Sequence, residues 1–472
     1  MRKIVLVGAC VGAWLFACTG DDTLTVVPDA GSPIDAATVT DAAQPDSAQP
    51  DSSKPDAADP NDGFTDAEWA LLKTLSPGGA KPPADTTNKY ADNPAAATLG
   101  QMLFYDPGYS GAIVAGRDGT NGGLGAVGET GKVSCVSCHS GQGTEDARSK
   151  PGNVSLGTNY GTRNALSLFD SSYQAWTNWG GRFDSQWSLP PAVAENPATM
   201  NGTRLQIVHL VYDKYKTEYE AVFGALDPAI ADTARFPPSG KPATPPATGA
   251  WETMNILDQT TAMRVWANFG KAIAAYIRLL VTKNAPFDKY VAGDRSALDE
   301  SQKRGLRAFI GKGACVSCHS GPALTDGKFH ALVVPQSGPN VPAADLGRFQ
   351  DVPPLLASPL NVNGAYSDDT TTNKLTGLAQ ADSQKGQFRT PTLRNVARTG
   401  PYMHSGQLAT LADVVKYYDQ GGGDPGDAGV VKDPLFKPLG LQGTTAADLV
   451  KFMESLNGAA VPAGLLQDTH KP

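Results

Sequence analysis

Two short motifs in the chain carry residue types that hold metal cofactors. They span residues 135–139 and 315–319, and both read C-V-S-C-H. This spacing lets two thiols reach the two vinyl groups of one porphyrin while the adjacent histidine turns beneath the ring to bind iron. By chance, a chain of this length and composition is expected to contain only about 0.001 such motifs. The motifs therefore predict two covalently attached c-type haems, held by Cys135, Cys138, His139, Cys315, Cys318 and His319.

Other uses of these cysteines fit the pattern less well. A structural zinc site takes four ligands, whereas each motif offers three in one cramped run. A thioredoxin-type C-x-x-C pair stands in a βαβ context that the surrounding sequence lacks, and it does not explain a histidine after both motifs. The remaining cysteines, Cys10 and Cys18, lie near the N-terminus, so no pair is left for a disulfide.

Helical segments are expected to position both motifs. Residues 301–310 carry apolar side chains on one side and end at Gly311-Lys312-Gly313. Residues 96–104 form a similar approach, followed by an Asp-Pro-Gly turn and a glycine-rich loop. Between them, residues 260–281 have the strongest amphipathic pattern of the chain, which indicates a core helix. A further helix is expected over 205–215.

The composition bounds the class of protein. The chain has 472 residues, of which 18% are charged, and no stretch beyond the N-terminus is apolar enough to span a membrane. Low basic content argues against nucleic-acid binding. We predict an all-α fold with two cytochrome c-like haem domains packed together and long loops. The domains are expected at residues 63–295 and 296–460, with a loose tail at 461–472.

The first 18 residues have the pattern of an export signal. A basic start precedes an apolar run over residues 4–17, and Cys18 follows. Leu15 to Cys18 also resembles the bacterial lipobox, in which the cysteine becomes lipidated. Phe16 is bulkier than that pattern usually has, so plain cleavage nearby is an alternative. An uncleaved membrane anchor is disfavoured, because the run is shorter than a spanning helix.

Residues 19–62 form an acidic segment of Asp, Ala, Pro and Ser without aromatic residues. Such a composition cannot bury enough apolar surface to fold, so we expect a disordered tether. Ten aspartates against the single Lys54 place most of the net charge of −8 in this segment. The folded body is therefore nearly neutral.

The order of motifs from residue 96 to 457 resembles the bacterial di-haem cytochrome c peroxidase and MauG family. The resemblance rests on Leu103-Phe104-Tyr105-Asp106, the first haem motif, Arg163-Asn164, Trp179-Gly180-Gly181-Arg182, the stretch from Gly321 to His330, the stretch from Phe388 to Val396, the stretch from Thr399 to Gly406, and the stretch from Val414 to Gly422.

The resemblance implies two unequal haems. The one on His139 would be five-coordinate and meet hydrogen peroxide, while the one on His319 would receive or store electrons. The family pattern puts Tyr418 in place as sixth ligand of the second iron, with Tyr417 and Met403 as alternatives. Phenolate ligation would lower the haem potential relative to a thioether. A buried structural role is the other interpretation of Tyr418.

Further site residues follow from the same resemblance. Trp179 matches the family tryptophan between the haems, although core packing would also explain it, and Arg182 closes its motif at the expected active site. Asn164 and the carbonyls of Thr399 and Pro401 fall on the family's inter-domain calcium positions. Oxygen ligands from both domains suit a hard cation.

The distal pocket departs from the family pattern. Counting without gaps, the family's Gln, Pro and Glu positions hold Leu189, Val193 and Thr199. A distal carboxylate normally moves a proton between the peroxide oxygens. Glu195 lies one helical turn away and is the candidate replacement, with a plain exposed glutamate as the alternative.

Two other departures concern electron flow. Residues 157–159 read Gly-Thr-Asn where many peroxidases carry a histidine that blocks the resting N-terminal haem. That iron is therefore expected to stay open without reductive activation. Gly313 stands where MauG has a tryptophan that passes holes, which counts against that route here.

Several cationic side chains have simpler interpretations. His330 and His404 lie in family motifs near the C-terminal haem, where hydrogen bonds to a propionate or the backbone are expected. Arg348, Arg389 and Arg394 are candidate propionate partners or plain surface charges.

The expected function is peroxide reduction, or peroxide-driven oxidation of a substrate, with electrons from a small periplasmic donor such as a cytochrome c or copper protein. The alternatives are a non-enzymatic electron carrier with a degenerate pocket and, with less support, a peroxide or redox sensor. We expect an exported protein on the periplasmic or cell-envelope side, held to the membrane by lipid.

Overall fold

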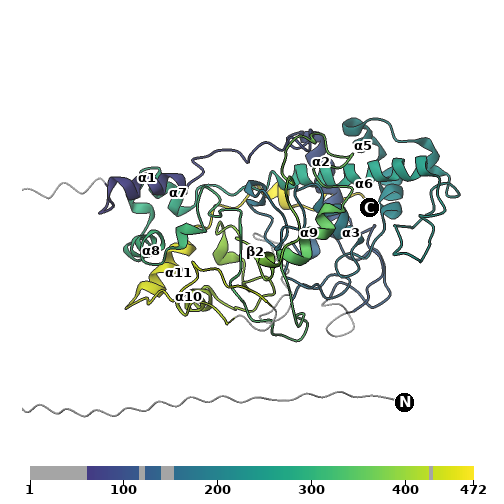
Figure 1. The fold of residues 1–472 in the computed structure, drawn as a ribbon. Coiled ribbons are helices and arrows are strands. Elements are labelled where there is room, and N and C mark those ends of the chain that lie inside the picture. Colours follow the sequence, from purple (N-terminus) through teal and green to yellow (C-terminus); the bar gives the residue numbers. More distant parts are fainter. Residues whose placement is uncertain (1–60, 116–122, 140–153, 425–428) are drawn as a thin grey trace, which may run out of the picture. The chain divides into compact units, whose positions relative to one another are not determined.

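The structure is a computed structural model that describes residues 61–115, 123–139, 154–424 and 429–472. Helices carry most of its regular structure (Figure 1). In the described chain, β1 (Phe329–His330) pairs antiparallel with β2 (Phe388–Arg389) in a small two-stranded sheet. The predicted all-α class therefore holds apart from this sheet. The helices are α1 (Asp66–Thr74), α2 (Pro94–Tyr105), α3 (Leu189–Glu195), α4 (Arg204–Lys214), α5 (Lys216–Phe223), α6 (Ile256–Ile277), α7 (Pro286–Val291), α8 (Glu300–Ile310), α9 (Arg348–Leu356), α10 (Leu411–Asp419) and α11 (Thr445–Glu454).

Local side-chain caps begin the helices that lead to the two cysteine motifs. Before α2, the Asn93 side chain accepts hydrogen bonds from two backbone amides of the first turn, and a proline follows it. Before α8, Asp299 and Gln302 cap each other's backbone amides. Both predicted approach helices are confirmed, and α6 begins four residues before the predicted core helix.

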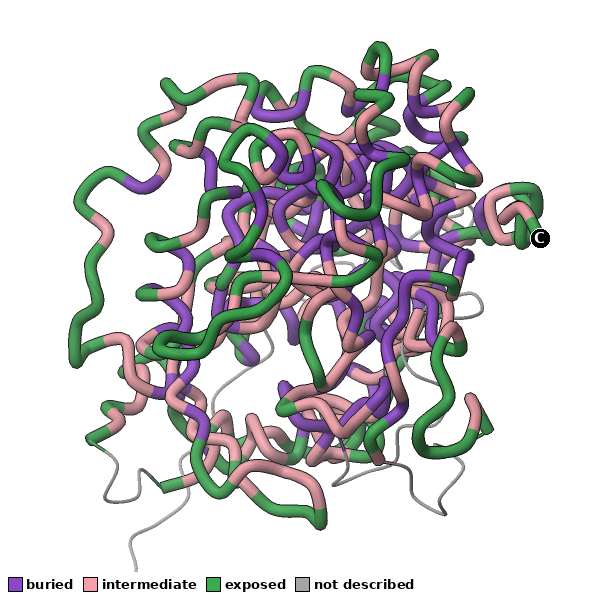
Figure 2. Tube along the Cα trace, turned by 90° about the vertical axis from the view of Figure 1, so that its right-hand side faces the viewer, coloured by how far each residue is buried: buried purple, intermediate pink, exposed green. Residues whose placement is uncertain are grey.

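Two hydrophobic clusters form the core. The first gathers around α2, α4 and α6, and the second around α1, α7, α8 and α11; Figure 2 shows the buried residues along the chain. Each cluster contains a helix crossing that only glycine permits. A Cβ atom on Gly100 would lie 1.9 Å from the carbonyl oxygen of Ala272, and one on Gly305 would lie 1.9 Å from that of Asp448. Backbones therefore approach equally closely in both clusters.

The clusters do not follow the predicted boundary between residues 295 and 296. Trp69 of α1 and Phe287 of α7 pack in the second cluster, although both precede that boundary. The tail at 461–472, predicted as loose, returns to the first cluster because its apolar residues are buried there. Val461 is 5% exposed, and the Tyr276 hydroxyl donates to the carbonyl of Leu465 at 2.6 Å. All described residues belong to one unit, Asp59–Pro472.

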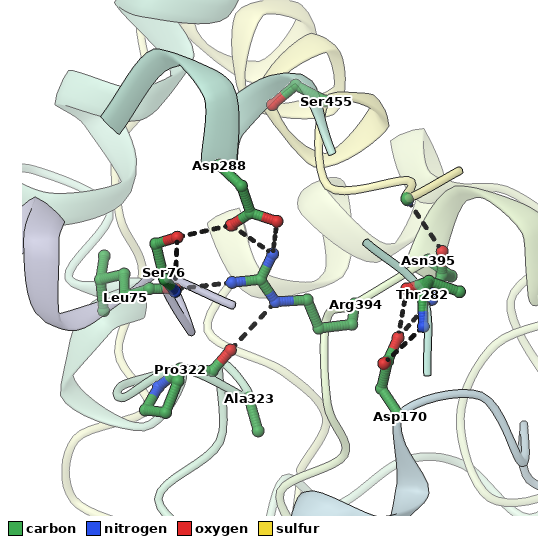
Figure 3. A network of polar contacts seen from close by, with 12 residues as sticks. Leu75, Ser76, Asp170, Thr282, Asp288, Pro322, Ala323, Arg394, Asn395 and Ser455 are labelled. Carbon is green, nitrogen blue, oxygen red and sulfur yellow. Dashed lines mark hydrogen bonds and ion pairs between the residues drawn. The ribbon is translucent and has the colours of Figure 1, made fainter. Parts of the chain in front are cut away.

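Buried polar contacts join segments that are distant in sequence. The Asp170 carboxylate accepts hydrogen bonds from the backbone amide of Thr282 at 3.0 Å and from the side-chain amide of Asn395 at 2.8 Å (Figure 3). Asn395 in turn accepts a bond from the amide of Gly458 at 3.0 Å. The Asp170 carboxylate thereby ties the residues after α6 to those before α10 and, through Asn395, to those after α11.

The predicted signal, the lipobox at Cys18 and the tether up to residue 60 lie outside the described residues. Asp62, predicted as the end of the tether, belongs to the folded chain, because it accepts a bond from the Tyr290 hydroxyl at 2.9 Å and pairs with Lys303 at 2.7 Å. No helix in the described ranges is long and apolar enough to cross a bilayer.

Candidate functional site

The C-terminal motif forms a short turn after α8. Residues Cys315–Ser317 make one 3-10 turn, and the amide of His319 donates to the carbonyl of Cys315 at 2.8 Å. The Nδ1 atom of His319 lies 3.1 Å from the carbonyl oxygen of Leu324. Because a carbonyl only accepts, Nδ1 carries the proton and Nε2 keeps a lone pair for a metal. Burial lowers the pKa of His319 to about 4, so the ring is neutral, as iron ligation requires.

This turn opens into a cavity with a volume of about 290 Å³. That size is near the lower end for pockets that hold small molecules, and apolar side chains form most of its wall. The predicted residues of the second haem site meet there. Among the residues that line it are Cys315, Cys318, His319, Trp179, Arg389, Met403, His404 and Tyr418.

Tyr417 is a structural residue. Its hydroxyl lies 2.8 Å from the carbonyl oxygens of both Leu332 and Val333, and it accepts a hydrogen bond from the amide of Gly423 at 2.8 Å. The bonding capacity of this phenol is therefore used within the chain. This removes Tyr417 as a candidate for the sixth ligand.

Tyr418 differs from Tyr417 in the hydrogen bonding of its hydroxyl. Its ring packs edge-on against Phe436 with centroids 4.7 Å apart, and within the described part of the chain no hydrogen bond to its hydroxyl is found. Burial, followed by the sulfurs of Cys315 and Cys318, raises the pKa of Tyr418. A bound cation would reverse that shift. Tyr418 and Met403 both line the cavity, and Tyr418 as ligand stays a prediction.

The arginines near this cavity differ in their partners. Arg394 donates to both carboxylate oxygens of Asp288 at 2.8 and 2.9 Å and to the carbonyls of Leu75 and Pro322 (Figure 3). Arg389 is 3% exposed and makes no ion pair with any described residue, and burial lowers its pKa to about 10. A buried guanidinium without a counter-charge is unfavourable. A haem propionate would supply the missing charge at Arg389, whereas Arg394 is already paired.

The N-terminal motif makes the same turn. Residues Cys135–Ser137 form a 3-10 turn, and the amide of His139 donates to the carbonyl of Cys135 at 3.0 Å. The Cys135 sulfur lies 3.6 Å from the hydroxyl of Tyr109, a fully buried residue that sequence reasoning missed. Burial raises the pKa of Cys135 to about 11.

Trp179 lies where segments of the two predicted domains meet. Its indole N–H donates to the carbonyl of Asn164 at 2.8 Å, and its ring is edge-on to His404 with centroids 6.4 Å apart. Two buried arginines hold its turn. The amide of Arg389 donates to the Trp179 carbonyl at 2.7 Å, and the Arg348 guanidinium donates to the next two carbonyls at 3.1 and 2.6 Å. Arg348 is thus a backbone clamp rather than a surface charge.

The predicted calcium ligands include an unsatisfied buried atom. The side-chain oxygen of Asn164 is buried and has no hydrogen-bond partner in the described ranges. The carbonyls of Thr399 and Pro401 accept no backbone bond there either, and all three residues line the same cavity. An unpaired buried oxygen is unfavourable, and a hard cation would satisfy it. These residues therefore fit the predicted ion.

Glu195 is held in a buried ion pair rather than exposed. Its two carboxylate oxygens each lie 2.9 Å from the Arg204 guanidinium, and one also accepts the Arg204 amide at 2.8 Å. The guanidinium lies 4.1 Å from the ring centroid of Trp266 and 4.8 Å from that of Trp251. Sequence reasoning missed Arg204, because an arginine at the start of a helix carries no motif that marks a buried partner.

The other distal positions bond to the backbone. The hydroxyl of Thr199 donates to the carbonyl of Val193 at 2.5 Å, and its carbonyl accepts the amide of Thr158 at 2.8 Å. A Cβ atom on Gly157 would lie 2.2 Å from that carbonyl oxygen, so the loop without the blocking histidine is closely packed. Arg182, expected at the active site, is exposed to solvent.

His330 and His404 bond to side chains rather than to the backbone, which was one of their two predicted partners, and the propionate contact stays a prediction. His330 lies between two carboxylates, 2.6 Å from Asp433 and 2.9 Å from Asp326. His404 lies 2.6 Å from the side chain of Gln336. Two nearby carboxylates hold His330 more strongly than a backbone carbonyl would, which explains the difference.

Comparison with known proteins agrees with this arrangement. Residues 94–296 match the family model "Di-haem cytochrome c peroxidase". The chain is 30% identical over 380 residues to cytochrome-c peroxidase IdrP1 of Pseudomonas sp. strain SCT, which covers 78% of this chain and 82% of that protein. It is also 30% identical over 277 residues to cytochrome c551 peroxidase of Pseudomonas aeruginosa, covering 58% and 62%. The solved structure of the diheme peroxidase BthA from Burkholderia thailandensis has a similar fold, with a TM-score of 0.55, 21% identity, and coverage of 84% of this chain and 94% of that one.

Helical architecture and two C-x-x-C-H turns define a protein of the c-type cytochrome class. Within that class, the chain belongs to the di-haem cytochrome c peroxidase and MauG family, and it is a peroxidase-type oxidoreductase. Membership implies two c-type haems. The predicted family is confirmed.

Proposed function

We propose that the chain reduces hydrogen peroxide, or uses it to oxidise a substrate, at a haem on His139, with electrons relayed from a haem on His319. The cavity beside Cys315 and Cys318 carries the proposal, because it combines His319, whose protonated Nδ1 leaves Nε2 as the metal-binding atom, with the buried Arg389, which has no ion-pair partner among the described residues. When bound, the two haems supply iron for peroxide reduction and a store for electrons. The residues of the chain hold and orient them.

Tyr418 is proposed as the sixth ligand of the second iron. Its support is the contrast with Tyr417. The Tyr417 hydroxyl is bonded to the backbone, whereas the Tyr418 hydroxyl has no hydrogen bond to any described residue. Trp179 is proposed as the bridge between the haems, since its ring lines the cavity and its turn is fixed by Arg348 and Arg389.

Calcium is proposed at Asn164, Thr399 and Pro401. The support is the unpaired buried oxygen of Asn164, whose carbonyl also accepts the indole N–H of Trp179. An ion bound by the Asn164 side chain would hold this residue in place, and with it the carbonyl that binds the Trp179 indole. Waters would complete its coordination.

A second candidate is an electron-transfer cytochrome without peroxide turnover. One observation favours it. Glu195 is engaged on both oxygens by Arg204, and the family's distal positions hold Leu189, Val193 and Thr199. A carboxylate held in this way is poorly placed to carry a proton between peroxide oxygens.

One measurement separates the two candidates. The reduced haem-loaded protein is mixed with hydrogen peroxide while the Soret band and the oxidation of a donor are followed. The peroxidase proposal expects donor oxidation in step with peroxide loss. Absence of turnover, with both haems loaded, would overturn the peroxidase proposal and leave the electron carrier as the candidate. A Glu195→Gln variant with unchanged turnover would remove Glu195 as proton shuttle.

We further propose that the protein is exported and lipid-tethered through Cys18, and that a small cytochrome c or copper protein donates its electrons. The support is the apolar leader ending at Cys18 and the acidic segment after it. Radiolabelled palmitate incorporated by the wild type but not by Cys18→Ser would test the tether.

A further inference from the structure

Tyr215 and Asp106 form a buried hydrogen-bonded pair in the first hydrophobic cluster. The Tyr215 hydroxyl donates to the Asp106 carboxylate at 2.6 Å, and the two residues are 0% and 1% exposed. The same carboxylate accepts bonds from the Lys214 ammonium at 2.9 Å and from the Gly108 amide at 2.7 Å. Neither Tyr215 nor Asp106 has a part in the proposed peroxide site, so their pairing is unexplained by it.

The chemistry of tyrosine oxidation makes this pair unusual. Loss of one electron makes a phenol strongly acidic, so the hydroxyl proton must pass to a base within hydrogen-bond reach. A backbone carbonyl is too weak a base to keep that proton, whereas a carboxylate can hold it. A tyrosine that donates to a carboxylate is therefore equipped for oxidation, and one that donates to a carbonyl is not.

This criterion separates the buried tyrosines. Tyr109 and Tyr276 donate to the carbonyls of Leu103 and Leu465. In the described part of the chain, two tyrosine hydroxyls are recorded as donors to a carboxylate. They belong to Tyr215, bonded to Asp106 at 2.6 Å, and Tyr290, bonded to Asp62 at 2.9 Å.

A short route connects Tyr215 with the first haem motif, through buried side chains and the exposed Gly108 of one turn. The Asp106 carboxylate accepts the amide of Gly108, and the next residue in that turn is Tyr109. The Tyr109 hydroxyl lies 3.6 Å from the sulfur of Cys135. Hydrogen bonds and two aromatic residues of one cluster therefore lead from Tyr215 to a sulfur that attaches the haem. Tyr290 packs instead in the second cluster.

We infer that Tyr215, with Asp106 as its proton acceptor, is a redox site that gives an electron toward the N-terminal haem when peroxide arrives without an electron donor. Reduction of peroxide to two waters takes two electrons and two protons. Tyr215 would supply one electron, a haem on His139 would supply the other, and solvent would supply the two protons. The Tyr215 O–H bond breaks, the proton goes to the Asp106 carboxylate, and a neutral tyrosyl radical remains beside a neutral carboxylic acid. This inference rests on the proposed function.

The surroundings of the pair suit this role. Burial and the hydrogen bond to Asp106 raise the pKa of Tyr215, so the resting phenol keeps its proton. The C-terminal tail covers it. The Lys471 amide donates to the Tyr215 hydroxyl at 3.1 Å, and the Lys471 ammonium pairs with Glu218 at 2.7 Å. Water is thereby kept from the radical, and the proton on Asp106 is available for its return.

The test uses the haem-loaded full chain without an electron donor. One equivalent of hydrogen peroxide is added, the mixture is frozen within milliseconds, and the electron paramagnetic resonance spectrum is recorded. We expect a tyrosyl signal that narrows in protein grown on ring-deuterated tyrosine. The signal is expected to be lost in Tyr215→Phe and kept in Tyr290→Phe, the matched control with the same type of hydrogen bond. If Tyr215→Phe fails to load haem, Asp106→Asn takes its place and is also expected to lose the signal.

The outcomes separate the inference from the function it rests on. A wild type that oxidises donor with peroxide but gives no tyrosyl signal overturns the inference and leaves the function standing. An undiminished signal in Tyr215→Phe, or in Asp106→Asn where that variant is used, does the same. A wild type that consumes no peroxide even with donor overturns both.

Discussion

The two haem-motif regions share one backbone turn but differ in how their polar side chains are used. At the C-terminal motif, His319 keeps Nε2 for a metal, and the hydroxyl of Tyr418 has no hydrogen bond in the described chain. Arg389 donates to two carbonyls there but has no ion-pair partner. At the N-terminal motif, the candidate acid Glu195 is fully paired with Arg204. Since a buried polar or charged group is unfavourable without a bonding partner or counter-charge, the first arrangement suits a ligand that bonds to these groups.

This difference bears on the assignment of roles. The C-terminal region has a candidate iron ligand in His319, a candidate sixth ligand in Tyr418 and, in Arg389, a candidate counter-charge for a haem propionate. In the N-terminal region, among the described residues, the negative charge of Glu195 is balanced by Arg204. Electron storage is therefore the better supported half of the proposed reaction, and the proton chemistry of peroxide is the half that experiments must decide.

Removal of both C-terminal cysteines should have the largest effect. A Cys315→Ser, Cys318→Ser variant cannot form the thioether bonds of the second haem, so the covalently bound haem per chain should fall by about half. The pyridine haemochrome absorbance of the purified protein measures this. A variant that keeps two covalent haems would mean that the cavity beside His319 is not a c-type site.

Loss of the Arg204 side chain should have the next largest effect, a loss of stability, because it would leave Glu195 charged and buried. The side chains of Arg204 and Glu195 are 9% and 12% exposed. Breaking such a pair from one side costs about 3–5 kcal/mol, so Arg204→Ala should unfold at clearly lower urea concentration. Arg182→Ala, at an exposed position, is the matched control and should stay within about 0.5 kcal/mol of wild type. Equal behaviour of the two variants would contradict a structural ion pair on the N-terminal side.

Local chemistry explains which parts of the molecule could be predicted. Haem attachment depends on five consecutive residues, so the two motifs identify Cys135 and Cys315 without any fold. The approach helices begin at caps made by neighbours within three residues, as at Asp299. Both features are visible in a short window of sequence.

Features that depend on distant contacts could not be predicted in this way. The partner of Glu195 is Arg204, nine residues away in the next helix. The tail residue Leu465 meets Tyr276 across 189 residues of chain. Helix α1 has an ordinary capped sequence, and nothing in it indicates that Trp69 packs beside Tyr290 in the second cluster. Such pairings are set by three-dimensional packing and have no periodic signature.

The C-terminal cavity should also respond to pH through His404. Burial lowers the pKa of His404 to about 4, compared with a usual value of about 6.5. The folded protein therefore favours the neutral ring. Above pH 6.5 the ring is neutral in both the folded and the unfolded chain, and stability is at its full value. As the pH falls from 6.5 to 4, the unfolded chain binds a proton that the folded protein does not, and stability is lost. The size of this contribution is on the order of 3 kcal/mol.

The difference between wild type and His404→Gln isolates this effect from the carboxylates that titrate in the same range. We expect the wild-type free energy of unfolding in urea to fall more steeply than that of the variant between pH 7 and pH 4. Parallel curves would show that His404 is not held neutral, and the cavity would then be more open to water than its burial indicates.

The two helix crossings offer the smallest but most direct comparison of the halves. Gly100 in α2 meets the carbonyl of Ala272, and Gly305 in α8 meets that of Asp448, each at 1.9 Å from where a Cβ atom would lie. Gly100→Ala and Gly305→Ala should therefore each destabilise by about 1–3 kcal/mol through overpacking, despite the better helix propensity of alanine. Gly249→Ala, where the nearest atom would be 3.5 Å away, is the control. Urea unfolding of the three variants measures the effects.

Because the contacts at Gly100 and Gly305 are alike, the losses of stability in the two variants should be similar. If one variant is near wild type, the backbone at that crossing can move apart, and that half of the protein is the more deformable one.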